Sequence, residues 1–384
     1  MIASLALFLL TLSSPASLGA SGPESANQSH SPESSVSSSR SFEQISKLAM
    51  EAWNDNRDEN AIGLFEQGLK MKPDWNEGLW YLGVLNYDKD RFFDARSFLR
   101  HYLAQNPNQG PGWAMLGLCD YQLREYGRAL EHLNHATSLG LGGRTQLADT
   151  VFYDQAILLT RDGQFEASTR LLYRIRGDAG SRAQGPLEVP AGLNALSYQL
   201  LPEEVPSNRL EFVRLMGAAA FARLDQQRGK AKTILRDLVA DHPSEKGAHY
   251  QYGSMLLEDD LAGGVEEMQK VLDISPSDTA ARLQLAQYYM QHSQAEKAKP
   301  YLDETLKLAP SNPIAHMLNG KMQEAAGDIQ GAISELELAR QTAPEEPQVL
   351  WALLHIYTVA GRRDDAARVK DAIAKVQEIS QSAK

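Results

Sequence analysis

Apolar residues recur along most of the chain at the spacing of helical faces. Around Ala49, for example, Ile45, Leu48 and Ala52 follow one another in steps of three and four, which places them on one side of a helix with 3.6 residues per turn. Short turn sequences interrupt such runs, as in KDRFFDA ending at Ala95. The pattern therefore predicts an all-α chain built from helical hairpins.

Small residues and prolines repeat in phase with these runs. The first-helix series lies 33 or 34 residues apart, except for intervals of 39 (117 to 156) and 63 (156 to 219), and consists of Ala49, Gly83, Gly117, Ala156, Ala219, Gly253, Ala286 and Gly320. A second series runs in step with it, from Ala61 and Ala95 to Ala366, and prolines such as Pro73 and Pro310 close most units. Small side chains let two helices approach closely, and proline ends the second helix. A hairpin of this size cannot bury its apolar face alone, so successive hairpins must stack.

The repeated unit resembles the tetratricopeptide-repeat family, whose pattern is W-x2-L-G-x2-Y…A-x3-F…P. One unit matches it at Trp113, Leu116, Gly117, Ala129, Leu133 and Ala136, with Tyr121 displaced by one position, and another at Leu285, Ala286, Tyr289, Ala298, Leu302 and Pro310. One departure is Leu141, which stands where the closing proline is expected. The resemblance implies a tetratricopeptide-type helical-hairpin solenoid, a right-handed superhelix of about nine repeats in two arrays. It also implies that a concave groove binds extended peptides or partner helices.

The ends of the chain differ from the repeats. Residues 1–20 contain an apolar run from Ile2 to Leu12 followed by small residues, which predicts a secretory signal peptide. The basic residues usual before such a run are missing, so an uncleaved membrane anchor remains the alternative. Residues 21–41 are Ser-rich without an apolar period and predict a disordered tether. We therefore expect an exported protein, periplasmic or secreted, with membrane anchoring as the lesser option and no membrane span after cleavage.

The interval of 63 residues divides the repeats into two arrays. We predict an N-terminal array of about four repeats at 42–180 and a C-terminal array of about five at 210–384, which ends in a polar capping helix. Between them, residues 181–209 form an insert with prolines at Pro186, Pro190, Pro202 and Pro206. This insert is either a degenerate helix around 191–201 or an ordered crossover.

Charge and composition favour a protein partner over other ligands. The net charge of −11 and a pI near 5.4 argue against nucleic acid, which requires a concentrated basic surface. Cys119 is the single cysteine, so neither a disulfide nor a cysteine metal cluster can form within the chain. EHLNH at 131–135 lacks a third metal ligand and is interpreted as surface polarity. No P-loop, HExxH or G-x-S-x-G motif occurs, so we expect neither enzyme activity nor a metal or cofactor.

The predicted partner-binding groove lies one residue beyond the buried stripe of the first helices. In the first array these positions are mainly aromatic or apolar: Met50, Trp53, Trp80, Val84, Tyr87, Leu118, Tyr121, Tyr153 and Ile157. In the second array they are more polar, with Gln287, Trp351 and His355 among them. The aromatic positions indicate a contact surface or, alternatively, packing between neighbouring first helices.

Two classes of function remain open. The first is a non-catalytic scaffold that binds a protein or peptide partner in the concave groove, outside the cytoplasm. The second is a structural assembly subunit of an envelope or secretion complex that uses its convex face or the insert. An accessory subunit of an enzyme is a third option.

Overall fold

The computed structural model describes residues 40–143, 145–179 and 184–382. The predicted signal peptide and residues 21–39 of the predicted tether lie outside the described residues. Within these ranges the chain contains α-helices, one short 3-10 helix and no strand. The prediction of an all-α, tetratricopeptide-type hairpin solenoid is confirmed.

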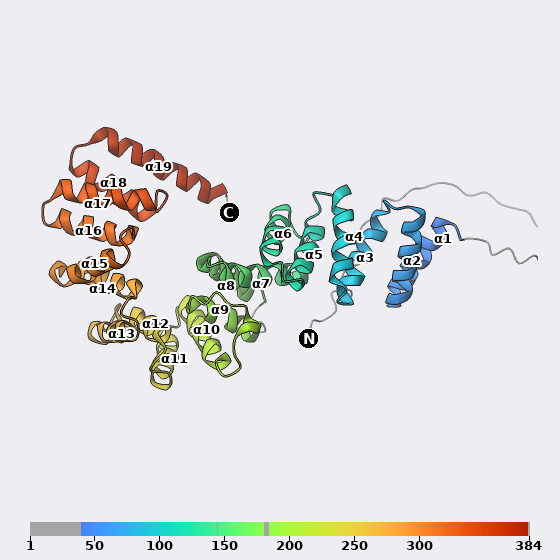
Figure 1. The fold of residues 1–384 in the computed structure, drawn as a ribbon, viewed down its shortest axis with the longest axis horizontal. Helices are drawn as coiled ribbons and strands as arrows, with labels where there is room; N and C mark the ends of the chain where they lie inside the picture. The colour runs from blue at the N-terminus through green and yellow to red at the C-terminus, as the bar shows by residue number, and fades with distance from the viewer. Residues whose placement is uncertain (1–39, 144, 180–183, 383–384) are drawn as a thin grey trace, which may run out of the picture. The chain divides into compact units, whose positions relative to one another are not determined.

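Contacts divide the chain into two compact units. Unit 1 comprises the residues up to Pro190 together with Ser197–Glu204, and unit 2 comprises Ala191–Leu196 together with the residues from Val205 onward. Each odd-numbered helix from α1 to α7 packs on the helix that follows it, as does each even-numbered helix from α10 to α18, so the described residues contain nine hairpins. Figure 1 shows that the helices of each unit follow one another in sequence order.

The helices of unit 1 are α1 (Phe42–Asn54), α2 (Asp58–Met71), α3 (Asn76–Asp88), α4 (Phe92–Gln105), α5 (Gly110–Gln122), α6 (Tyr126–Leu139), α7 (Thr145–Arg161) and α8 (Phe165–Ala179). α9 (Gln184–Ala195) spans the boundary, and η3 (Pro202–Glu204) belongs to unit 1. Unit 2 continues with α10 (Leu210–Leu224), α11 (Arg228–Asp241), α12 (Lys246–Leu256), α13 (Leu261–Ile274), α14 (Thr279–Gln291), α15 (Ala295–Leu308), α16 (Pro313–Ala325), α17 (Ile329–Thr342), α18 (Pro347–Val359) and α19 (Arg363–Ser382).

The small residues stand where two helices of a hairpin touch. A Cβ atom built on Gly83 would lie 2.7 Å from the side chain of Leu99, and one on Gly117 would lie 2.8 Å from that of Leu133. Ala95 on α4 is fully buried at the same contact between α3 and α4. Larger side chains would separate the helices, because protein interiors are close-packed. The period in the sequence therefore records the close approach within each hairpin.

Two buried histidines in unit 2 link one hairpin to the end of the previous one. The Nδ1 of His249 lies 2.6 Å from Glu267, and its Nε2 lies 3.0 Å from the carbonyl oxygen of Pro243. His316 makes the same two contacts, to Glu335 at 2.7 Å and to Pro310 at 2.8 Å. Because both ring nitrogens face oxygen atoms, the doubly protonated imidazolium satisfies both contacts. Each histidine thus joins a first helix to its own second helix and to the preceding proline.

The insert is partly helical, but its helix lies earlier than predicted. α9 ends at Ala195, and Pro190 lies within it rather than before it. Residues 196–201, which we expected at the end of the helix, are not helical. The position of the helix was wrong because prolines usually mark helix boundaries, whereas here one is accommodated inside.

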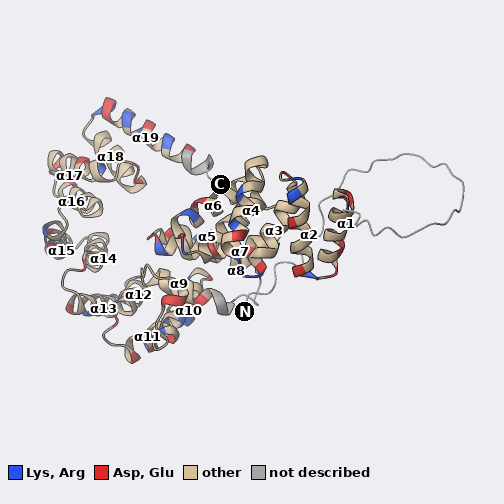
Figure 2. Ribbon diagram, turned by 45° about the vertical axis from the view of Figure 1, so that its right-hand side comes forward, with Lys and Arg blue, Asp and Glu red and all other residues tan. Residues whose placement is uncertain are grey.

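The last helix, α19, packs on α18 through one side. Val369 and Ile373 are buried against the apolar core of the last hairpins, while basic and acidic residues are interspersed along the rest of α19 (Figure 2). None of the helices in the described residues combines the length and the apolar character needed to cross a membrane.

Candidate partner-binding faces

The nine predicted groove residues lie on the first helices of unit 1 but differ in exposure. We call the surface formed by these positions on α1, α3, α5 and α7 the first-helix face. Val84, Leu118 and Ile157 are at most 2% exposed and belong to the hydrophobic core of the unit. Trp53, Trp80 and Tyr87 are also buried, and Met50, Tyr121 and Tyr153 are half-buried.

The buried aromatic residues pack against rings on neighbouring helices. Trp80 on α3 has its ring centroid 5.5 Å from that of Tyr102 on α4, and Tyr87 lies 5.5 Å from Phe92. The ring of Trp53 on α1 lies 5.2 Å from that of Tyr81 on α3. Such pairs stabilise the packed helices. For these three residues the structure therefore matches the alternative interpretation, in which aromatic side chains pack between helices.

A non-helical stretch of the chain itself lies on the first-helix face of unit 1. This return segment, Ser197–Glu204, belongs to unit 1 although the residues on either side of it belong to unit 2. Leu201 is fully buried in the same hydrophobic cluster as Leu118 and Ile157. Part of the predicted groove is thus filled by the chain's own residues.

Two carboxylates of the return segment bind side chains of α5 and α7. The hydroxyl of Tyr121 donates a hydrogen bond to Glu203 Oε1 at 3.2 Å. The guanidinium of Arg161 donates to both carboxylate oxygens of Glu204, at 2.9 and 2.7 Å, and lies over the ring of Tyr126 at 4.8 Å. A guanidinium is well suited to hold a carboxylate through two contacts. The segment is therefore fixed by directional polar contacts as well as by Leu201.

A buried acid lies beneath these contacts. Asp154 on α7 is 8% exposed, and burial together with the charge of Glu203 raises its pKa to about 7. Burial and the charge of Asp154 raise the pKa of Tyr153 to about 12. Burial and Glu203 also raise the pKa of Tyr121. The face thus disfavours additional negative charge, because desolvation and like charges both favour the neutral acid.

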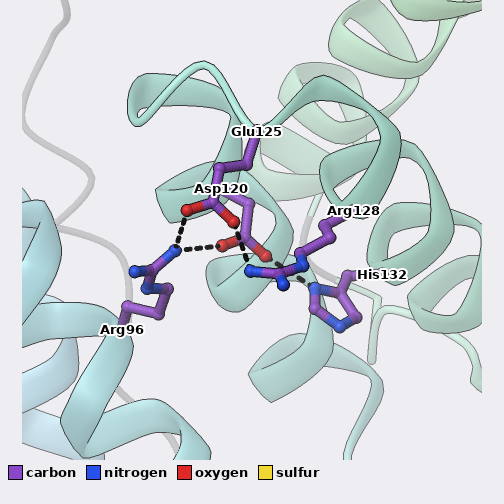
Figure 3. A network of polar contacts seen from close by, with 5 residues as sticks. All are labelled: Arg96, Asp120, Glu125, Arg128 and His132. Atoms are coloured by element: carbon purple, nitrogen blue, oxygen red, sulfur yellow. Dashed lines mark hydrogen bonds and ion pairs between the residues drawn. The ribbon is translucent and has the colours of Figure 1, made fainter.

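A second polar cluster joins the second and third hairpins (Figure 3). Asp120 on α5 is fully buried and accepts hydrogen bonds from Arg96 on α4 at 3.2 Å and from His132 on α6 at 2.7 Å. Arg96 also donates to Glu125 at 2.8 Å. Burial alone would raise the pKa of Asp120, but the hydrogen bonds from His132 and Arg96 lower it below its ordinary value. This cluster links three helices by paired charges.

The cluster has no nucleophile or metal ligand set beside it. Cys119 is fully buried, and burial raises the pKa of its thiol to about 12, so the thiolate is scarce at neutral pH. Among the described residues no three His, Cys, Asp or Glu side chains are placed to hold a metal ion. His132, which we interpreted as surface polarity, is instead paired with Asp120 and packs on Trp113, with ring centroids 5.3 Å apart.

The first helices of unit 2 carry a polar pocket that the sequence pattern did not identify. It has a volume of about 400 Å³ and is lined by residues of α10, α12 and α14 and the residues that follow them, among them Arg223, Ser254, Gln284, Gln287, Gln291 and His292. The Oγ of Ser254 is buried without a hydrogen-bond partner in the described structure. Three glutamines in one helix were a signal for such a polar wall, but their convergence with Arg223 depends on how the hairpins stack.

A large aromatic side chain is exposed on the same set of first helices. Trp351 on α18 is 53% exposed, and His355, one turn later, places its Nε2 2.8 Å from Glu324 on α16. Exposed tryptophans often anchor protein contacts. Unit 2 therefore presents an open first-helix face, with the pocket and Trp351 on it.

Comparison with known proteins agrees with the repeat pattern. The tetratricopeptide-repeat family model matches residues 46–110 and 283–347. These stretches begin in α1 and α14 and each covers hairpins of the stack. The matches and the hairpin geometry support a tetratricopeptide-repeat protein, as the sequence predicted.

Two curated relatives match over most of the chain. The chain is 25% identical over 276 residues to human Protein O-mannosyl-transferase TMTC3, which covers 67% of this chain and 29% of the relative. It is 26% identical over 275 residues to Cellulose synthase operon protein C of Pseudomonas fluorescens (strain SBW25), which covers 64% of this chain and 21% of the relative. The chain thus spans less than a third of the length of either relative.

Solved structures resemble the chain at low sequence identity. Yeast Tom70 aligns with 88% of this chain and 84% of its own, at 10% identity and a TM-score of 0.40. The anaphase-promoting complex hetero-tetramer Cut9–Hcn1 aligns with 87% of each chain, at 11% identity and a TM-score of 0.39.

Proposed function

We propose that the chain is a non-catalytic scaffold that binds a peptide or partner protein on its first-helix faces. The observation that carries this proposal is the return segment, an eight-residue non-helical stretch held on unit 1 by Tyr121, Arg161 and the core around Leu118. A face that holds one extended stretch through side chains has the donors and apolar surface needed to hold another. The exposed Trp351 and the polar pocket supply comparable features in unit 2.

The proposed place of action is outside the cytoplasm. Support comes from the apolar run Ile2 to Leu12 and the small residues that follow it. If the signal is cleaved, the protein purified from its host will begin at Ser17 or Ser21, which N-terminal sequencing detects. A chain that begins at Met1 and fractionates with membranes would instead support the uncleaved anchor.

Capture of partners from the native host tests the binding proposal. The full chain is compared with a variant of the first-helix face, Trp351→Ala with Gln287→Ala, both at exposed positions. The matched control is Phe93→Ala with Tyr173→Ala, which alters exposed residues on the second helices α4 and α8. We expect the first-helix variant to lose partners that the control variant retains, with both variants keeping the helical circular dichroism of the wild type.

The opposite result would favour the structural assembly subunit. Phe93 is 69% exposed and Tyr173 is 45% exposed, so the second helices also offer aromatic contacts. Loss of partners only in the Phe93 and Tyr173 variant would place the contact there. Deletion of residues 181–209 is a poor test of the insert, because it removes the buried Leu201 from the core of unit 1.

An accessory role beside an enzyme is the third candidate. The printed names of the two relatives, a mannosyl-transferase and a cellulose synthase operon protein, favour it. Co-purification of a glycosyltransferase activity with the wild-type chain, lost with the first-helix variant, would support this role.

A further inference from the structure

We propose that the first-helix face of unit 1 binds partner segments in which a leucine is followed three residues later by a carboxylate, and that the return segment is the resident ligand of this site. The inference rests on the proposed function and specifies the partner's chemistry. The spacing is that of Leu201 and Glu204. The four residues Leu201 to Glu204 therefore serve as the template for the partner.

The apolar anchor of the template is Leu201. Its side chain is fully buried and belongs to the cluster that contains Leu118, Ile157 and Val84 on the first helices. These three residues were predicted from the repeat register to line a groove. A fully buried leucine contributes about 1.5–3 kcal/mol through its removal from water. The anchor accounts for affinity but gives little sequence specificity, because apolar contacts are not directional.

The polar part of the site provides the specificity. Arg161 reaches both oxygens of Glu204, and the backbone N–H of Leu201 donates to the same carboxylate at 2.8 Å. The carboxylate thus folds back over the anchor residue and fixes the spacing between them. The fork of the Arg161 guanidinium favours a carboxylate over a neutral acceptor at this position.

The position between anchor and carboxylate is not optimal in the resident ligand. Glu203 accepts a hydrogen bond from Tyr121, but its charge contributes to the raised pKa of Asp154. A neutral acceptor, such as glutamine, keeps the hydrogen bond from Tyr121 and removes the repulsion. A partner with leucine, then a neutral polar residue, then a carboxylate therefore fits this face better than the chain's own segment does.

The resident ligand must be displaced before a partner binds. Because it is part of the same chain, its effective concentration is high, and a free peptide competes poorly with it. Weakening the resident segment should therefore reveal the site. This expectation distinguishes a ligand site from a segment that only completes the core, since a core segment would not be replaced by a separate peptide.

The test uses a fluorescent peptide with the sequence of residues 197–205, SYQLLPEEV, and the full chain. The first receptor variant is Glu204→Gln alone, which leaves the buried leucine in place, and the second is Glu204→Gln with Leu201→Ser. Fluorescence polarisation should show at least tenfold tighter peptide binding to the second variant than to the wild type. The same peptide with Gln at the position of Glu203 should bind more tightly than the original at pH 8.

Matched controls separate the anchor from the carboxylate. A peptide carrying Leu201→Ser, and another carrying Glu204→Gln, should each lose at least tenfold in affinity. Arg161→Gln in the weakened receptor should abolish the difference between the original and the Glu204→Gln peptide.

Equal binding to wild type and both variants, or no binding to a variant that keeps native helicity, would overturn the inference. If the doubly altered receptor unfolds, the single variant decides, with binding expected between that of the wild type and none of its peptide contacts shared by the Glu204→Gln peptide. Partner capture that depends on Trp351 while the peptide fails would overturn this inference and leave the proposed function standing.

Discussion

Tyr121 and Glu203 lie 82 residues apart in the chain, yet the tyrosine hydroxyl donates a hydrogen bond to the glutamate carboxylate at 3.2 Å. The contact brings a non-helical stretch onto the face of a helical repeat. Asp154 lies close enough to sense the charge of Glu203, which contributes to its raised pKa. The first-helix face of unit 1 is therefore defined by an acidic segment on a surface that already contains a buried acid.

Replacement of Leu201 by alanine should destabilise the protein by about 2–4 kcal/mol, because it leaves a cavity in the core of unit 1. Urea denaturation followed by circular dichroism measures this change. Leu200→Ala is the control, since Leu200 is only half-buried, and we expect a smaller loss. Equal losses would show that the anchor position is misassigned.

Asp154 should make the protein less stable as the pH rises. The pKa of this acid is about 7 in the folded protein and about 4 in an unfolded chain. Between these values the unfolded chain releases the proton and the folded chain keeps it, so the free energy of unfolding falls as the pH increases from about 4 to about 7. The loss is on the order of 3 kcal/mol above pH 7.

Asp154→Asn removes this ionisation. We expect the variant to gain stability relative to the wild type at pH 8 compared with pH 5, as measured by denaturation at both values. A stability difference between variant and wild type that does not change with pH would show that Asp154 is charged in the folded protein.

Ala95→Glu should cost roughly 3 kcal/mol or more, because it buries an unpaired charge where α3 and α4 touch. Ser97→Glu places the same side chain at an exposed position of the same helix and should change stability by less than about 0.5 kcal/mol. Thermal midpoints of the two variants provide the comparison. A wild-type midpoint for Ala95→Glu would contradict the packing of this hairpin.

Two glycines should respond to alanine in opposite directions. A Cβ on Gly192 would lie 1.8 Å from the carbonyl oxygen of Val213, so α9 and α10 must separate, and we expect a loss of about 1–3 kcal/mol. Gly63 in α2 has no such neighbour within 4 Å, and alanine there should stabilise the helix by about 0.5–1 kcal/mol. Denaturant midpoints for the two variants check both signs, and a loss at both sites would show that α2 is more crowded than described.

The repeat architecture was predictable because its determinants are local and periodic. Gly83 and Leu99 meet within one hairpin, as do Gly117 and Leu133, so the same spacing recurs in every unit. The register of the first helices also followed from this period. It placed Val84, Leu118 and Ile157 one residue beyond the buried stripe, but periodicity carries no information about what covers a face.

The return segment and the polar pocket were not predictable from the same signal. Arg161 and Glu204 are separated by 43 residues and meet only because the chain leaves the helical pattern at Ala195. The pocket of unit 2 depends on side chains from three hairpins that converge only after stacking. Proline spacing gave the limits of the insert but misplaced its helix, since Pro190 lies inside α9.

The alternating membership of residues 191–204 determines how the protein can be divided for expression. A fragment that stops at Pro190 would lack Leu201 and expose the apolar surface it covers, and would be prone to aggregate. A recombinant N-terminal fragment should therefore extend through Glu204, at the cost of carrying six residues, 191–196, that belong with the other half.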